Sequence, residues 1–311
     1  IAAKYTADAA SGDLVPVKLV NRRAHGRPNP EGRVVEVIER DTHHFVGTYF
    51  ERLGRGYVDV DGGVFSQPIS VGDPGAKNAQ TDDKVVIELI RFPSHLDAGE
   101  GVLTEVLGAR GTPGVDTLTV IRQYGFPEVF AEDALEQARR VAAEFDDRQV
   151  PDDRLDLTGE TVITIDPVDA RDFDDAISLE RLDGGHWRLG VHIADVSHFV
   201  RQHTPLDREA YQRTTSVYLP DRVLPMLPEL VSNGVASLQP DRLRFTKSVF
   251  IEFTADGAPV ATDWHRAAIK SVRRFAYEEV DEFLAKPAAW TSRLTPEVFS
   301  LLERMRDLSR M

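Results

Sequence analysis

Five aspartates fall within ten residues, between Asp166 and Asp175, and apolar runs border this segment on both sides. The run 161–166 before it and the run 176–179 after it are predicted to be buried strands. Because the segment that joins them is short, the aspartate side chains should converge at one end of a sheet. The chain must therefore fold so that a dense group of negative charges is held between two buried strands.

Carboxylates this close together repel each other, and each raises the pKa of its neighbours unless a cation neutralises them. A site that offers oxygen ligands alone suits a hard ion, Mg²⁺ or Mn²⁺, rather than zinc. Such ions complete their coordination with water and substrate phosphate, and a pair of them serves in-line phosphoryl hydrolysis. The segment therefore indicates metal-dependent chemistry at a phosphate group.

Two other interpretations of the segment need to be weighed. Asp-rich loops are usually solvated turns, in which the side chains bond their own backbone. A calcium loop of the EF-hand type needs glycine at its sixth position and an acid at its twelfth. Counted from Asp166, these positions hold Arg171 and Ile177. The EF-hand interpretation therefore fails, whereas the solvated turn stays open.

The chain has 311 residues, which predicts about two domains. Its composition, 41% hydrophobic and 28% charged, is typical of a soluble globular protein. No apolar run reaches the roughly 18 residues of a membrane span. The net charge of -14 argues against binding DNA or anionic membranes by bulk charge. The absence of cysteine and of a signal peptide at the start of the sequence leads us to expect a cytoplasmic protein.

Short alternating runs divided by turn residues predict a small barrel in the first third of the chain. The runs are 33–38, 45–50, 56–60, 63–68 and 84–90, with a further strand at 101–107. Apolar residues at helical spacing then predict one amphipathic helix over 127–145. A larger domain begins near residue 156 and contains a predicted strand at 187–194. It also contains a predicted helix at 206–213, capped by Thr204.

Three segments of the larger domain are distinctive. They are TIDPVDARDFDDAIS at 164–178, VHIADVSHFV at 191–200 and TSVYLPDRVLPMLPELVSN at 215–233. Together they resemble the catalytic domain of the ribonuclease II / ribonuclease R family, on its ribonuclease R side. The resemblance implies an α+β multidomain fold. In this fold a small all-β barrel of the OB or cold-shock type is followed by a larger mixed α/β catalytic domain, truncated at its C-terminal side.

The same resemblance divides the chain into four parts. It implies a remnant of a first cold-shock barrel at 1–30 and an OB-type cold-shock domain at 31–110. A linker with the amphipathic helix follows at 111–150, and part of the catalytic RNB domain occupies 151–311. The family also has a later part of the catalytic domain and an S1 RNA-binding domain, which are expected partners of this chain.

The resemblance assigns roles to single aspartates. Asp166, Asp172, Asp174 and Asp175 stand where the family has its metal-binding aspartates. Asp174 and Asp175 are the expected catalytic residues, and loss of Asp174 is expected to stop cleavage while RNA binding remains. Asp169 lies in the same segment but outside the family's four.

Two tyrosines and an arginine are the expected RNA contacts of the larger domain. Tyr218 matches a tyrosine that stacks on the 3′ nucleotide, and stacking accepts any base because every base has a π-face. Tyr277 matches a tyrosine expected near the ribose, where the 2′-hydroxyl distinguishes RNA from DNA. Arg222 could contact an RNA phosphate or form a surface pair with Asp221 or Glu229.

Further candidates are weaker. In the barrel, Tyr57 or Phe50 is predicted to face outward and stack on bases. His192 and His198 flank an aspartate, but histidines within a strand are more often hydrogen-bonded core residues than an acid/base pair. A basic cluster either lines an RNA path or covers a solvated helix face. Its members are Lys270, Arg273 and Arg274.

The leading hypothesis is therefore a hydrolytic exoribonuclease of RNA decay and processing. It would use Mg²⁺, or Mn²⁺ in its place, to degrade single-stranded RNA from the 3′ end to nucleoside 5′-monophosphates. DNA is not expected as a substrate, and no membrane partner is expected. One alternative is a non-catalytic RNA-binding fragment or inert truncated homologue that works through its barrel. A second alternative is a carboxylate-metal site for another phosphate substrate, such as a nucleotide.

Overall fold

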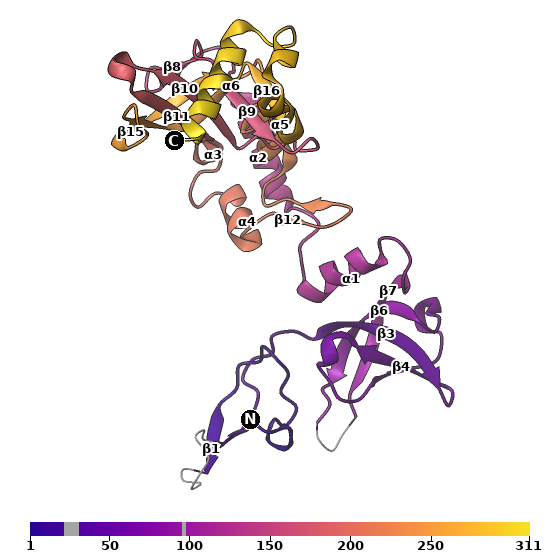
Figure 1. Cartoon of the computed structure of the whole chain (residues 1–311). Helices are drawn as coiled ribbons and strands as arrows, with labels where there is room; N and C mark the ends of the chain where they lie inside the picture. The colour runs from indigo at the N-terminus through magenta and orange to yellow at the C-terminus, as the bar shows by residue number, and fades with distance from the viewer. Residues whose placement is uncertain (22–30, 95–97) are drawn as a thin grey trace. The chain divides into compact units, whose positions relative to one another are not determined.

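The computed structural model describes residues 1–21, 31–94 and 98–311, which form two compact units (Figure 1). The first unit contains residues 1–128 and 218–224, and the second contains residues 129–217 and 225–311. Part of the segment assigned to a barrel remnant, 22–30, lies outside the described residues.

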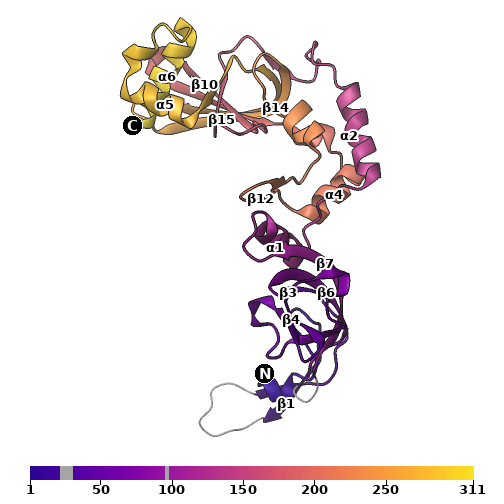
Figure 2. The same ribbon diagram turned by 90° about the vertical axis from the view of Figure 1, so that its right-hand side faces the viewer.

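The first unit is built around a closed barrel with the strand order β3-β4-β5-β7-β6 (Figure 2). Its strands are β3 (His44–Arg52), β4 (Arg55–Val60), β5 (Ile69–Gly72), β6 (Asp83–Arg91) and β7 (Glu100–Ala109). Side chains alternate between inside and outside, so that Tyr49, Val58 and Ile87 are fully buried in the barrel core. The predicted barrel is confirmed.

Two details of the barrel prediction are wrong. The run 63–68 is not a strand, because the turn at η2 (Asp61–Gly63) contains Gly62 and Gly63 at positive φ, and the next strand begins only at Ile69. The run 33–38 does not join the barrel either. Its first residues belong to β2 (Glu31–Val34), which pairs in antiparallel register with β1 (Val17–Asn21). A short 3₁₀ helix, η1 (Ala3–Tyr5), precedes β1.

Helix α1 (Val115–Tyr124) packs against the barrel and was not predicted. Val115 and Leu118 contact a cluster formed by Val46, Val86 and Leu107. The helix is rich in β-branched residues, which have low intrinsic helix propensity, so packing against the barrel rather than local preference stabilises it.

The second unit contains a mixed sheet with the strand order β16-β9-β10-β11-β14-β15-β8. The strands are β8 (Leu155–Leu157), β9 (Ile163–Asp166), β10 (Asp175–Arg181), β11 (Trp187–Ala194), β14 (Leu243–Phe253), β15 (Pro259–Lys270) and β16 (Arg273–Ala276). Strand β16 runs parallel to β9, and β10 lies antiparallel between β9 and β11. The buried strands predicted around the aspartates are therefore neighbours in one sheet.

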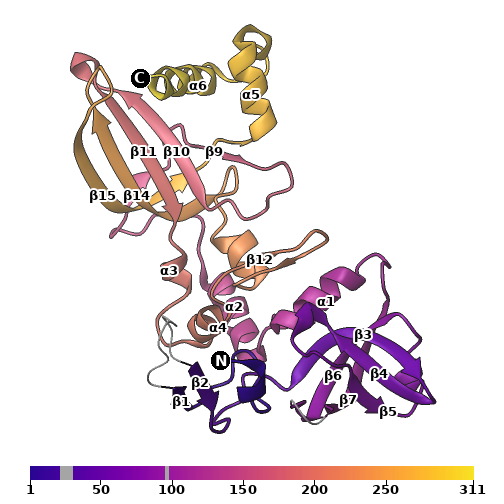
Figure 3. The same cartoon turned by 60° about the horizontal axis from the view of Figure 1, so that its bottom comes forward.

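Each face of this sheet carries its own apolar cluster, and two longer helices cover one of the faces. Helices α5 (Tyr277–Ala285) and α6 (Pro296–Ser309), joined through η6 (Pro287–Trp290), lie over one face of the sheet (Figure 3). Their apolar side chains pack around Trp187 of β11. The opposite face carries a separate cluster that includes Leu238 and Phe250. The predicted barrel followed by a larger mixed α/β domain is thus the observed architecture.

A smaller helical group completes the second unit. It consists of α2 (Glu132–Glu144), α3 (Val196–Phe199), α4 (Pro205–Arg213) and a π-helix (Leu230–Val235), which share one apolar cluster. Helix α4 begins as predicted, because the Thr204 side chain accepts a hydrogen bond from the Asp207 N–H and Pro205 is the first helical residue. None of the helices in the described ranges is long and apolar enough to cross a membrane.

Candidate active site

The four aspartates are brought together by the loop between β9 and β10. Asp166 is the last residue of β9 and Asp175 is the first residue of β10, while Asp172 and Asp174 lie in the connecting loop. Because β9 and β10 are neighbours, the loop crosses one end of the sheet. The Ala194 N–H, at the end of β11, donates a hydrogen bond to the Asp174 carbonyl (2.9 Å) and fixes the loop to the sheet.

The aspartates act on one another electrostatically. Burial raises the pKa of Asp166, and the charges of Asp175 and Asp172 raise it further, while the nearby Thr164 hydroxyl and the charge of Arg274 lower it. Asp174 reaches the surface, yet enough protein surrounds its carboxyl that loss of hydration raises its pKa. The charges of Asp172, Asp175 and Asp166 raise the pKa of Asp174 further. The loop therefore holds mutually repelling carboxylates, as the sequence predicts.

One oxygen of this group is left without a partner. The Oδ2 atom of Asp166 is buried and accepts no hydrogen bond from the residues that the structure describes. A buried polar atom without a partner costs about 1 to 3 kcal/mol, and more when it is charged. A divalent cation would supply both the missing contact and the missing positive charge, so the donor set fits Mg²⁺ or Mn²⁺.

The aspartate side chains are not arranged as a finished metal site. Within residues 1–21, 31–94 and 98–311, no three His, Asp or Glu side chains already surround a common metal position. The carboxylates thus lie close enough to shift each other's pKa without standing at ligand distances. Binding a cation requires their side chains to turn toward it.

Arg274 is a part of this site whose role was not identified from the sequence. Its guanidinium donates a hydrogen bond to the Pro167 carbonyl, next to Asp166, and lies 5.5 Å from the Phe173 ring centroid. The other members of the basic cluster do not share this position. Arg273 bonds Glu279 and the Arg293 carbonyl. Lys270 borders a separate cavity.

Tyr277 lies next to the aspartates. In the parallel pair of β16 and β9, Ala276 is the partner of Asp166, and Tyr277 follows it as the first residue of α5. The Tyr277 side chain is 53% exposed. The backbone of an exposed tyrosine therefore lies one residue beyond the strand partner of Asp166. Its role at a ribose stays a prediction.

Tyr218 and Arg222 belong to the first unit, on the hairpin of β12 (Val217–Tyr218) and β13 (Val223–Leu224). Tyr218 is 68% exposed, as a stacking residue must be. Arg222 pairs with Asp221 (3.1 Å) and, at 3.8 Å, with Glu128. Its charge is thus already engaged on the surface, and contact with RNA phosphate stays a prediction.

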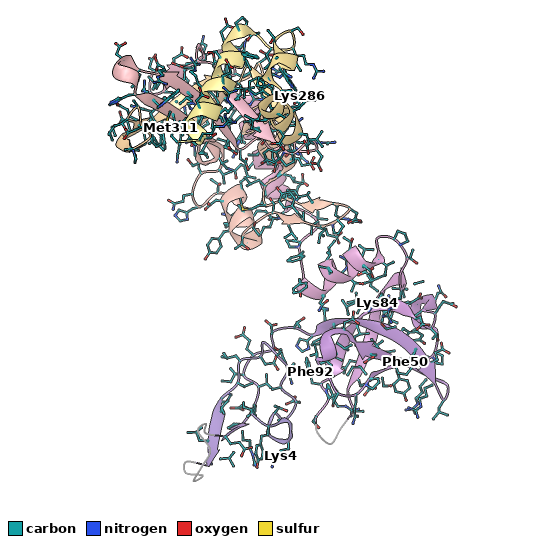
Figure 4. The ribbon with its side chains drawn as sticks, viewed as in Figure 1. Lys4, Phe50, Lys84, Phe92, Lys286 and Met311 are labelled. Atoms are coloured by element: carbon teal, nitrogen blue, oxygen red, sulfur yellow. The ribbon has the colours of Figure 1, made fainter. Side chains whose placement is uncertain are left out.

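The outer face of the barrel carries the predicted aromatic pair. Phe50, marked in Figure 4, is the cross-strand partner of Tyr57, and their rings stack with centroids 5.7 Å apart. Both are half-buried, whereas the adjacent Tyr49 and Val58 point into the core. The next outward pair is Arg52 and Arg55, so this face joins aromatic rings to positive charge.

His192 is a core residue on β11, whereas His198 is half-buried and lies in α3. His192 is fully buried and hydrogen-bonded to the Ser178 and Ser248 hydroxyls (3.0 and 2.8 Å), and burial lowers its pKa to about 4. His198 packs edge-on against Phe245 beside a buried ion pair. This pair joins Arg154 to Asp195 at 2.7 Å. The simpler interpretation, a hydrogen-bonded core histidine within a strand, is therefore confirmed for His192. For His198 it is wrong, because this residue lies in a helix and is only half-buried.

A cavity of about 730 Å³ adjoins the aspartate loop. Arg171 and Phe173 of the loop line one side, and Asn233 and Gly234 of the π-helix, with Gln239, line another. π-Helical turns occur frequently at functional sites. The loop is therefore bordered by an open pocket whose lining is partly polar and partly apolar.

Known protein families match both units. The RNB domain family matches residues 154–311, just over half of the chain, and the Cold shock domain family matches residues 57–131. Ribonuclease R of Thermotoga maritima is 40% identical over 262 residues, which cover 84% of this chain and 37% of that protein.

Solved structures match over most of the chain. "Mycoplasma genitalium RNase R in complex with ribose methylated single-stranded RNA" has a TM-score of 0.81 and 25% identity, and the match covers 91% of this chain and 45% of that one. "Structure of yeast Ssd1, a pseudonuclease" has a TM-score of 0.68 and 19% identity over 99% of this chain and 37% of that one, so it shares the fold alone.

The chain thus spans less than half the length of these relatives. The Cold shock and RNB matches agree with the predicted barrel and mixed α/β domain. The RNB match includes the aspartate loop and more than half of the residues. The chain belongs to the ribonuclease II / ribonuclease R family.

Proposed function

We propose that this chain carries the catalytic aspartates of a metal-dependent exoribonuclease. The enzyme shortens single-stranded RNA from its 3′ end and releases nucleoside 5′-monophosphates, in RNA decay and processing. The observation that supports this most is the mutual charge effect among Asp166, Asp172, Asp174 and Asp175 at one end of the sheet. Because the chain spans less than half of its relatives, the activity of the whole protein is part of the proposal.

Mg²⁺ is the proposed cofactor, with Mn²⁺ as the alternative, and the four aspartates would hold it through their carboxylate oxygens. When bound, the ion supplies Lewis acidity and positive charge at the scissile phosphodiester. The Asp174 carboxylate, which reaches the surface at the end of the loop, would also accept a hydrogen bond from the attacking water and hold it in place. Hydrolysis in this form needs no protein nucleophile.

Aromatic rings provide the proposed contacts with single-stranded RNA. Tyr277, beside Asp166, would lie against the ribose, and Tyr218 would stack on the 3′ nucleotide. Phe50 and Tyr57 on the barrel would stack on bases further along the strand. The similar RNase R of Mycoplasma genitalium forms a complex with single-stranded RNA, which supports RNA as the partner. DNA is not a proposed substrate, and a cytoplasmic location is proposed.

The experiment uses single-stranded RNA labelled at either end, incubated with the chain and Mg²⁺. The proposal expects progressive loss of the 3′ end, with nucleoside 5′-monophosphates as product. EDTA and Asp174→Asn should both abolish the loss. Asp169→Asn is the matched control, because it removes the same charge from an exposed position in the same loop. Shortening from the 5′ end, or shortening that survives EDTA, would overturn the proposal.

RNA binding without cleavage is the second candidate. It is favoured by the finding that no metal position is already formed by side chains in the part of the chain that the structure describes. The pseudonuclease match adds that this fold alone does not establish cleavage. Tight binding of RNA that stays intact with Mg²⁺ would favour this candidate. Cleavage of mononucleotide esters, with RNA untouched, would instead favour a nucleotide substrate.

A further inference from the structure

One serine, far along the chain from the aspartates, holds the backbone on both sides of Asp172. The Ser237 hydroxyl accepts a hydrogen bond from the Phe173 N–H (3.1 Å) and donates one to the Arg171 carbonyl (2.9 Å). The N–H of the next residue, Leu238, donates to the Phe173 carbonyl (2.9 Å). These three hydrogen bonds, from Ser237 and Leu238 to residues 171–173, are called the clamp below.

Ser237 is itself held firmly. It is fully buried, and its carbonyl accepts a hydrogen bond from the buried Nε of Arg244 (2.8 Å). Another nitrogen of Arg244 donates to the Gly234 carbonyl in the π-helix (3.2 Å). Leu238 is buried in the apolar cluster on one face of the sheet. The clamp on the loop thus connects to the core of the second unit.

These hydrogen bonds lie among carboxylates that repel one another. Asp172 and Asp174 flank Phe173, and the charge of Asp172 raises the pKa of Asp174. Mutual repulsion favours loop conformations in which these carboxylates separate. A hydroxyl that bonds the backbone on both sides of Asp172 restricts those conformations, and supporting hydrogen bonds of this kind commonly change metal affinity by about 10- to 100-fold.

We propose that Ser237 is a positioning residue of the aspartate site. Its hydroxyl fixes residues 171–173 so that the carboxylates of Asp172 and Asp174 can turn toward one cation. The inference rests on the proposed function and deepens it, because it adds a residue that neither contacts substrate nor carries charge.

Two substitutions of equal size distinguish the effect of losing the hydroxyl from the effect of changed packing. Ser237→Thr keeps the hydroxyl and Ser237→Val replaces it with a methyl group, so any strain from the added volume is common to both. Ser237→Ala removes the hydroxyl without added volume. Ser271→Ala is the matched control, because Ser271 is equally buried but its hydroxyl bonds the Arg273 carbonyl (3.4 Å) rather than the aspartate loop.

The first measurement is Mn²⁺ affinity by isothermal titration calorimetry in the absence of RNA. We expect Ser237→Ala and Ser237→Val to weaken Mn²⁺ binding by about tenfold or more. Ser237→Thr should bind more tightly than Ser237→Val, and Ser271→Ala should match the wild type. The second measurement is RNA cleavage, in which kcat should fall for Ser237→Ala while KM stays unchanged.

Several results would overturn the inference. They are wild-type Mn²⁺ affinity in Ser237→Ala, equal affinity in the Thr and Val variants, and an equal loss in Ser271→Ala. A wild-type chain that binds Mn²⁺ but leaves RNA intact would refute the proposed function, while the calorimetric comparison still decides the role of Ser237. A wild-type chain that binds no Mn²⁺ would overturn both.

Discussion

Ala276, the last residue of β16, is paired in parallel register with Asp166, the last residue of β9. The pair ends both strands at the same edge of the sheet, so α5 begins, at the exposed Tyr277, one residue beyond the partner of the most buried of the four aspartates. A residue more than 100 positions away in sequence thereby becomes a neighbour of the aspartate loop.

This register gives a prediction about substrate choice. If Tyr277 lies against the ribose, Tyr277→Ala should reduce the ratio of cleavage rates for RNA over an oligonucleotide with 2′-deoxyribose at its 3′ end. The ratio is measured from initial rates on the two substrates under identical conditions. Tyr211→Ala, at an 84% exposed position on α4, serves as a control and should keep the wild-type ratio. An unchanged ratio in Tyr277→Ala would refute the ribose contact.

Arg274 is predicted to stabilise the loop in the absence of metal. Arg274→Gln removes the hydrogen bond to Pro167 and the positive charge that opposes the aspartates, and should lower the free energy of unfolding by about 1.5 to 3 kcal/mol. The three tryptophans, Trp187, Trp264 and Trp290, all lie in the second unit, so tryptophan fluorescence in a denaturant titration reports its unfolding.

Lys270→Gln is the matched control for this change. It removes the same charge from the same cluster but at a side chain that borders a different cavity, and should cost no more than about 0.5 kcal/mol. Added salt should narrow the gap between Arg274→Gln and the wild type, because it screens the repulsion among the carboxylates. Equal stabilities of the two variants would contradict the role of Arg274.

His192 predicts how stability depends on pH. Its pKa is about 4 in the folded chain against 6.5 for an ordinary histidine, because burial disfavours the charged ring. The unfolded chain therefore binds a proton below pH 6.5 that the folded chain does not bind until about pH 4. Stability is full above this window and falls as the pH drops through it, by about 3 kcal/mol in total. His192→Gln should flatten this part of the profile, and an identical profile would show that the prediction is wrong.

The stacked pair on the barrel predicts a loss of RNA affinity. Phe50→Ala or Tyr57→Ala should each weaken binding of single-stranded RNA by about 1 to 3 kcal/mol, with little dependence on base sequence. The measurement is a fluorescence-anisotropy titration at fixed salt. Tyr124→Ala is the control, because Tyr124 is an exposed aromatic of the same unit on α1, stacked on Phe126. Equal losses in the control and in the pair would indicate a general effect of aromatic removal.

The parts of the site that could be predicted from sequence are those with local causes. The apolar runs around the aspartates become β9 and β10, and a short loop between neighbouring strands necessarily gathers its charges. Ser237 and Arg274 could not be predicted in the same way. Their hydrogen bonds to the loop join residues 64 and 107 positions apart in sequence, and nothing in their local pattern distinguishes them from other serines and arginines.

The errors in the predicted fold also have physical causes. Helix α1 is stabilised by packing against the barrel, and the helix propensity of its own residues does not reveal that contact. The run 33–38 has the alternation of a barrel strand, but alternation predicts a strand and not its partner, and β2 pairs with β1 instead.

The central claim is that the aspartates repel one another until a divalent ion binds among them. The most direct test is the melting temperature of the second unit, followed by tryptophan fluorescence near neutral pH, for the wild type and Asp174→Asn with and without Mn²⁺. Because the charged form of Asp174 is disfavoured by the fold, Asp174→Asn should melt higher than the wild type without metal. Mn²⁺ at about 100 times its dissociation constant should stabilise the wild type by about 2.7 kcal/mol and the variant far less. A wild type that is indifferent to Mn²⁺ and melts no lower than Asp174→Asn without metal would contradict the account.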